Sequence, residues 1–167
     1  MTKPKVILIV AMLVGCTVFG YTQSLTTFIL VRHAEKATND PKDPDLSDIG
    51  RVRARRLAEL LVTTEIAAVY STNFKRTLQT AQPVASQKNL PVKLYQPHQR
   101  EVIEAMVSEH QGKTVLLVGH SNTTPWTANL LLGKPELKDF GDSEYGTILI
   151  VTLSTSHPAA QLLKLNY

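Results

Sequence analysis

The chain has few of the residues that build covalent or metal-bound scaffolds. Its 167 residues include a single cysteine, Cys16, so no intramolecular disulfide can form. It also lacks a His-x-x-His pair and a cluster of Asp and Glu residues with the spacing of a metal site. We therefore expect a protein that needs no disulfide framework, no metal ion and no other cofactor.

An excess of charge of one sign is also missing. The 18 Lys and Arg residues stand against 14 Asp and Glu residues, a formal net charge of +4. Lys3 and Lys5 belong to the N-terminal segment, and without them the excess is only +2. Domains that bind nucleic acids usually carry a much stronger positive charge, so we expect no nucleic-acid partner.

The N-terminal segment has the order of a secretory signal. Lys3 and Lys5 precede an uncharged apolar run that extends to about Tyr21 and is short for a transmembrane helix. The residues "VFG" permit cleavage before Tyr21, whereas "LVGC" resembles a bacterial lipobox in which Cys16 is lipidated. We expect residues 1–20 to be a signal peptide or a membrane or lipid anchor. The protein would then be exported to the periplasm or envelope, touching a membrane only through this segment.

Strand and helix patterns alternate through the remaining chain, residues 25–167. Such alternation predicts an α/β domain whose mainly parallel sheet is covered on both faces. Ser47 is expected to cap the first helix, whose apolar stripe runs from Ala54 to Leu61. The expected strands cover residues 27–31, 66–70, 92–95, 114–118, 146–153 and 161–165, and the later helices cover residues 74–88, 100–110 and 124–132.

Three of these strands are followed by cationic or potentially cationic side chains. Arg32 and His33 follow the first strand, Arg76 follows the second, and His120 follows the strand at 114–118. Ligands of such sheets bind beyond the carboxyl ends of the strands, so we expect these four side chains to form one site. Guanidinium groups match the oxygens of a phosphate, and a neutral imidazole can attack phosphorus to give a phosphohistidine.

Four segments also resemble, in order, the signatures of the histidine phosphatase superfamily. They are "VRHAEK", "LSDIGRVRARRLA", "VYSTNFKRTLQTA" and "VGHSNTTP", within residues 27–153. The sequence is most similar to the small phosphoglycerate-mutase-like and SixA-like phosphatases. The resemblance implies a three-layer α/β/α sandwich and a phosphatase that acts on a small phosphorylated substrate or on phosphohistidine. It assigns the nucleophile to His33, phosphate binding to Arg32 and Arg76, and the second histidine to His120.

The general acid of this family has no clear counterpart. Many members carry a glutamate after the third strand, but "YQPHQRE" at 95–101 has no glutamate at the expected place. Glu101, which ends this segment, and Glu104 could simply open a solvated helix. Either the enzyme prefers an activated phosphate, or Glu35 or His98 supplies the proton. Three further residues are candidates for contact with the substrate: Lys36 and Asn39 near the mouth of the site, and Asn122 beside His120.

Two alternatives to a phosphatase stay open. A non-catalytic, phosphate-binding envelope protein could use the same scaffold. A mutase is disfavoured because the short middle segment leaves little room for a lid that excludes water. Elsewhere we expect a solvated arginine face at residues 51–56, helix packing by Trp126, and a surface position without partners for His110.

Overall fold

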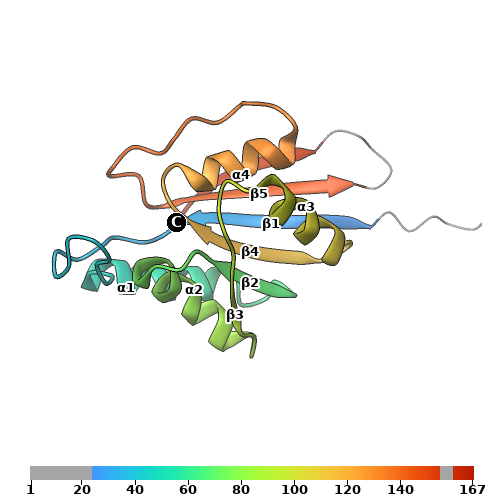
Figure 1. Cartoon of the computed structure of the whole chain (residues 1–167). Coiled ribbons are helices and arrows are strands. Elements are labelled where there is room, and N and C mark those ends of the chain that lie inside the picture. Colours follow the sequence, from blue (N-terminus) through green and yellow to red (C-terminus); the bar gives the residue numbers. More distant parts are fainter. Residues whose placement is uncertain (1–23, 155–159) are drawn as a thin grey trace, which may run out of the picture.

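The computed structural model describes residues 24–154 and 160–167, so the expected signal or anchor segment at residues 1–20 lies outside the described residues. All of the expected strands and helices are present, with ends shifted by one or two residues (Figure 1). In chain order they are β1 (Leu25–Arg32), α1 (Asp48–Leu60), β2 (Ala68–Ser71), α2 (Lys75–Gln87), β3 (Val92–Leu94), α3 (Arg100–Glu109), β4 (Thr114–Gly119), α4 (Thr123–Leu132), β5 (Thr147–Ser154) and β6 (Gln161–Asn166).

The strands form one mixed sheet with the order β3-β2-β4-β1-β5-β6. The pairs β1–β4, β2–β4 and β2–β3 are parallel, whereas β5 is antiparallel to both β1 and β6. The expected mainly parallel sheet is therefore confirmed, with an antiparallel margin at β5 and β6. Only six residues, 155–160, separate β5 from β6 in the sequence, a length that suits an antiparallel pair and is too short for the crossover of a parallel one.

Helices cover both faces of the sheet, which confirms the three-layer sandwich (Figure 1). Alternate residues of β1 pack in opposite directions: Ile29 and Val31 meet α1 and α2, while Phe28 and Leu30 meet α3 and α4. Burial on both faces explains why β1 reads as a continuous apolar run. Within the described ranges, no helix is long and apolar enough to cross a membrane.

The start of α1 is tied to the chain that leaves β1. The Ser47 hydroxyl caps the helix by accepting from the Gly50 amide at 3.1 Å, as the sequence predicts. The Ser47 amide in turn donates to the Glu35 carbonyl at 2.9 Å. A side chain at Gly50 would overlap that same carbonyl, so α1 can approach the end of β1 only because this residue is glycine.

Two expectations about exposed residues are wrong. Arg53 is not a free member of a solvated face, because its Nη2 pairs with Glu35 at 2.6 Å and its Nη1 donates to the Tyr167 carbonyl at 2.7 Å. His110 is buried, and its Nε2 lies 2.9 Å from the Tyr70 hydroxyl. Glu35, Tyr167 and Tyr70 are all distant in sequence from the residues that they contact, so helical periodicity alone gave no sign of these contacts.

Candidate active site

Three parallel strands end at the same edge of the sheet and bring their following residues together. In the strand register Arg32 pairs with Gly119, and Val118 pairs with Ser71. The amide of His33 then donates to the Gly119 carbonyl at 2.8 Å, which continues the pairing one residue past the strand. The structure thus brings Arg32, His33, Arg76 and His120 to one cleft, as their positions after strands predict.

His33 is held as a neutral imidazole with one nitrogen committed to the backbone. Its Nδ1 lies 2.8 Å from the Ala34 carbonyl, so we place the proton on Nδ1 and the lone pair on Nε2. Burial is the main cause that lowers the pKa of His33 to about 3, and His120, Arg32 and Arg76 act in the same direction. A neutral imidazole whose Nε2 carries a lone pair is a nucleophile.

A chain of hydroxyl groups holds His120 in place. Arg76 Nη2 lies 3.4 Å from Nδ1 of His120, which makes Nδ1 the acceptor, so Nε2–H donates to the Thr72 hydroxyl at 2.9 Å. Thr72 donates to Thr77 at 3.0 Å, and Thr77 donates to the Thr72 carbonyl at 2.9 Å. Burial, followed by Arg76 and Arg32, lowers the pKa of His120 to about 4.

Arg32 is buried beneath the loop that precedes β5. Its Nη1 donates to the carbonyls of Gly141 at 2.7 Å and of Glu144 at 3.1 Å, and its guanidinium lies 4.2 Å from the centre of the Tyr145 ring. Its Nε is buried and has no partner among the described residues. The side chain is therefore fixed by backbone carbonyls at the edge of the cleft that it lines.

Arg76 lies in the first turn of α2, where the loop after β1 holds it. Its Nη1 is 3.6 Å from Asp43, and its guanidinium lies 4.5 Å from the centre of the Phe74 ring. Asp43 also accepts from the Lys75 amide at 2.9 Å, so one carboxylate binds both the helix start and the arginine. Because Arg76 contacts Asp43 through Nη1, another part of its guanidinium stays available for a phosphate oxygen.

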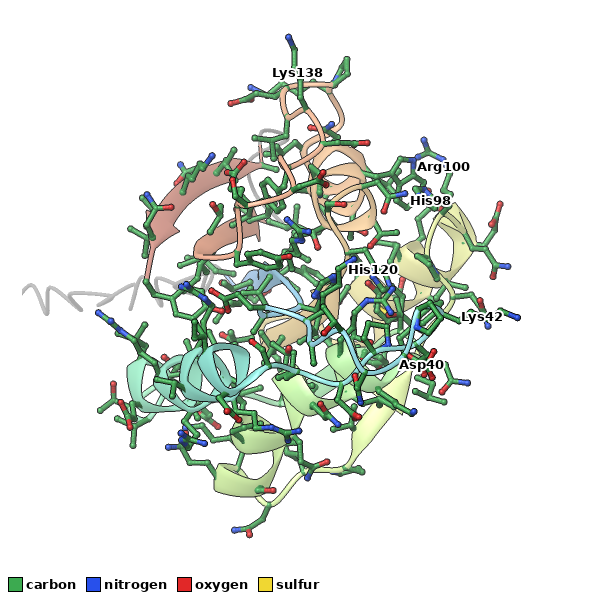
Figure 2. The ribbon with its side chains drawn as sticks, turned by 90° about the vertical axis from the view of Figure 1, so that its left-hand side faces the viewer. Asp40, Lys42, His98, Arg100, His120 and Lys138 are labelled. Carbon is green, nitrogen blue, oxygen red and sulfur yellow. The ribbon has the colours of Figure 1, made fainter. Side chains whose placement is uncertain are left out.

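Figure 2 looks onto this edge of the sheet. His120 lies between two walls, with Lys42 and Asp40 on the loop after β1 on one side and His98 and Arg100 on the other. The cleft has a volume of about 480 Å³. Besides the four central residues, its lining includes Lys36, Lys42, Phe74, His98, Ser121, Asn122, Thr123 and Asp142. Three of the candidate substrate contacts, Lys36, His98 and Asn122, therefore line the cleft.

The other two candidates, Glu35 and Asn39, do not line the cleft. Asn39 exchanges hydrogen bonds with Asp45 at 2.6 and 3.2 Å and so shapes the loop. The carboxylate of Glu35 accepts from Arg53 Nε at 2.9 Å with both oxygens. Burial acts to raise the pKa of Glu35, but the hydrogen bonds and charge of Arg53 lower it overall. Glu35 thus has a structural role, and the expectation that it could supply a proton is not supported by this geometry.

Several supporting residues were missed by the sequence analysis. Thr80 accepts from the Ala34 amide at 3.0 Å, next to the nucleophile. Gln79 accepts from the Leu46 amide at 2.7 Å and donates to Asp45 at 2.6 Å. The signal was present, because both lie one turn after Arg76 in "KRTLQTA", but threonine and glutamine are too common for spacing alone to mark them.

The described part of the chain brings no group of three or more His, Cys, Asp or Glu residues into a position to hold a metal ion. The charge in the cleft instead comes from side chains, namely the two guanidinium groups and the rim lysines Lys36 and Lys42. This arrangement can bind a tetrahedral dianion and present it to the Nε2 atom of His33.

Comparison with known proteins points to one family. Residues 28–98 match the sequence model of the Histidine phosphatase superfamily (branch 1). Phosphoserine phosphatase 1 of Hydrogenobacter thermophilus is 40% identical over 74 residues, covering 41% of this chain. The match spans only 35% of the length of that relative.

Solved structures share the fold over most of the chain. The mycobacterial glucosyl-3-phosphoglycerate phosphatase has a TM-score of 0.65 at 16% identity, covering 86% of this chain and 98% of its own. SixA from Agrobacterium tumefaciens has a TM-score of 0.64 at 22% identity, covering 85% and 98%. At these identities the likeness concerns the fold alone.

The two neutral histidines make the stability of the protein depend on pH. Their pKa values in the folded protein, about 3 and about 4, lie below the 6.5 of an unfolded histidine. Below pH 6.5 the unfolded chain therefore binds protons that the folded protein does not, and the free energy of unfolding falls as the pH drops. Each histidine contributes at most about 1.4 kcal/mol per pH unit.

Urea unfolding at pH 7 and pH 5 should show a smaller fall in the free energy of unfolding for His33→Asn and for His120→Asn than for the wild type. Equal falls in all three proteins would contradict the assignment.

Proposed function

Because the chain belongs to the histidine phosphatase superfamily, we propose that it is a phosphatase that works through a covalent phosphohistidine at His33. It hydrolyses a phosphomonoester or a phosphoramidate. The observation that carries the proposal is the hydrogen bond from Nδ1 of His33 to the Ala34 carbonyl, which leaves Nε2 unprotonated in a cleft with two arginines. Histidine fixed in this tautomer is ready to attack without first losing a proton.

The dianionic phosphoryl group binds between the two arginines. Arg32 lines the cleft with Nη1 held by backbone carbonyls, and Arg76 offers the part of its guanidinium that Asp43 and His120 leave available. Both charges lie in a partly buried cleft, where interactions with the developing charge on the equatorial oxygens are stronger than in water. The arginines thus bind the substrate and stabilise the transition state of transfer to His33.

His120 changes its protonation when the dianion binds. In the structure its Nδ1 accepts from Arg76 and its Nε2–H is held by Thr72. A dianion placed beside the ring favours the imidazolium form and opposes the burial that lowers the pKa. The proton gained on Nδ1 then becomes a third donor to the phosphoryl oxygens. Thr72 keeps the ring oriented throughout, because its bond is to the other nitrogen.

Trapping the intermediate tests the proposal. After brief incubation with a ³²P-labelled phosphomonoester and quenching in alkali, where phosphohistidine survives, the wild type should retain protein-bound label. His33→Asn should retain none and should lose at least about 1,000-fold in kcat, because it removes the nucleophile.

The matched control for trapping is His110→Asn, which removes a buried histidine outside the cleft and should retain label. Label that persists in His33→Asn would exclude His33 as the nucleophile. If the wild type binds phosphate reversibly and turns over no ester, the protein is a phosphate-binding protein instead of an enzyme.

Metal independence is the second part of the proposal. The guanidinium groups of Arg32 and Arg76 already supply the positive charge that a divalent ion would bring to the phosphoryl oxygens. Activity should therefore stay unchanged after dialysis against EDTA, as measured with p-nitrophenyl phosphate. Loss of activity that Mg²⁺ or Zn²⁺ restores would refute this part and leave the label-trapping result unaffected.

The substrate is a small phosphorylated compound or a phosphohistidine. Phosphoserine phosphatase 1 shares 40% identity over 74 residues, and its name indicates a small phosphorylated substrate for that relative, which supports the first of these classes. Only residues 95–99 separate β3 from α3 beside the cleft, so this connection forms no lid over the site. A phosphorylated intermediate in such a cleft is open to water, which favours hydrolysis over the mutase alternative.

We further propose that the catalytic domain, residues 25–167, is exported and that residues 1–20 direct it. The basis is the sequence pattern alone: two lysines, an apolar run, and small residues before Tyr21. Intact mass of the protein expressed in a bacterial host distinguishes the routes. Cleavage before Tyr21 gives a chain of residues 21–167, whereas lipidation leaves Cys16 as the modified first residue. An unprocessed mass in a soluble cytosolic fraction would contradict export.

A further inference from the structure

Hydrolysis of an ordinary phosphate ester requires a proton donor that the four central residues do not supply. An alkoxide is a poor leaving group unless a positioned acid protonates it as the P–O bond breaks. His33 receives the phosphoryl group on Nε2 and keeps its other nitrogen on the Ala34 carbonyl. His120 has Nε2–H on Thr72 and turns Nδ1 toward the Arg76 side of the cleft. A further acid has to come from elsewhere in the lining.

The nearby glutamates do not meet this need. Glu35 is bound by Arg53 and is absent from the cleft lining. Glu101 and Glu104 lie on α3 outside the lining, and Glu104 pairs with Arg100 at 3.5 Å. The titratable lining groups that are not yet assigned a role are therefore Lys36, Lys42, His98 and Asp142.

His98 lies on the wall of the cleft opposite Lys42 and Asp40 (Figure 2). The segment that carries it is attached to the active-site edge, because the Tyr95 amide donates to the carbonyl of Ser71 at the end of β2 at 3.1 Å. The His98 ring lies edge-on against Trp126 of α4, with ring centres 5.0 Å apart. Trp126 itself packs against the core as the sequence predicts.

The backbone of His98 is in the left-handed region, with φ of 61°. For a residue other than glycine this conformation is unfavourable, and it persists where the surrounding structure imposes it. Residues at active sites often show such strain. The His98 ring contacts Trp126 of α4 and lines the cleft, and the residue is exposed to solvent.

We propose that His98 is the general acid that protonates the leaving group and the general base that activates water; this rests on the proposed function. In the first step Nε2 of His33 bonds to phosphorus, the P–O bond breaks, and the electron pair stays on the leaving oxygen. The His98 imidazolium gives its proton to that oxygen, which leaves as an alcohol. In the second step neutral His98 takes a proton from a water molecule while the oxygen of that water bonds to phosphorus. The P–N bond then breaks, its electron pair returns to His33, and phosphate leaves.

The other candidates fit this double role less well. Imidazole is the side-chain group most often used as both general acid and general base in catalysis, whereas the ammonium groups of lysines rarely fill both roles. Asp142 lies in the loop whose carbonyls hold Arg32, with its own carbonyl 3.2 Å from Nη1, so its backbone already has a structural role. Its side chain is nevertheless the strongest rival, and the experiment includes it.

The test compares two substrates that differ in their need for a proton. The p-nitrophenolate ion leaves without protonation, whereas the alkoxide of β-glycerophosphate does not. His98→Asn removes the acid and retains a residue that tolerates positive φ. It should lower kcat/KM for β-glycerophosphate about 100-fold and change that for p-nitrophenyl phosphate by less than about threefold, the signature of a lost general acid. Gln96→Ala, in the same loop but outside the cleft lining, should behave as wild type with both substrates.

Four outcomes would overturn the assignment. Equal losses with both substrates would mean that His98 binds or positions the substrate, and no loss with either would mean that it has no role. The selective loss in Asp142→Asn instead of His98→Asn would move the acid to Asp142. A wild type that cleaves only p-nitrophenyl phosphate would show that no acid operates, while leaving the phosphatase proposal intact. A different result would contradict the phosphatase proposal itself. The wild type would not hydrolyse p-nitrophenyl phosphate, or this hydrolysis would persist in His33→Asn.

Discussion

Two guanidinium groups and two imidazoles can pack at one edge of the sheet only if the imidazoles stay uncharged. Burial of His33 and His120 beside Arg32 and Arg76 is the constraint from which the chemistry of the cleft follows. It removes two positive charges that would otherwise repel the arginines, and it leaves His33 with a lone pair on Nε2. A bound dianion reverses the electrostatic balance, so the site is stable while its imidazoles are neutral and becomes reactive when the substrate arrives.

The elements around the cleft maintain this arrangement through backbone carbonyls and threonine hydroxyls. Each central side chain is held by a segment distant in sequence: Arg32 by the carbonyls of residues 141–144, the backbone beside His33 by Thr80, and His120 by Thr72. Carbonyl groups stabilise a guanidinium without adding a negative charge that would compete with the phosphate. Asp43 is the exception, since it pairs with Arg76 directly, and its distance of 3.6 Å makes that pair a loose one.

The sequence predicts the strands and the central site because both depend on local pattern. A buried parallel strand appears as an apolar run, and the residue after it must lie at the carboxyl edge, so Arg32, His33 and His120 could be placed from the amino-acid pattern alone. The places of Glu35, Asn39 and Arg53 could not be predicted in this way. Glu35 directly follows Ala34, but the chain turns after β1, and the partner that draws Glu35 away is Arg53, 18 positions later. His110 is similar, since its burial depends on Tyr70, 40 positions earlier.

Strands and loops therefore contribute differently to the chemistry. The proposed nucleophile and phosphate-binding groups follow the inner strands β1 and β4 or lie in the first turn of α2. The proposed proton donor lies in residues 95–99 after the edge strand β3, which has only three residues and one strand neighbour. An edge strand and a short loop can change length or sequence without disturbing the paired core. For this reason the segment that carries the proposed proton donor can differ from the family pattern without disturbing the proposed phosphoryl site, and His98 can take the place of the glutamate that this chain lacks there.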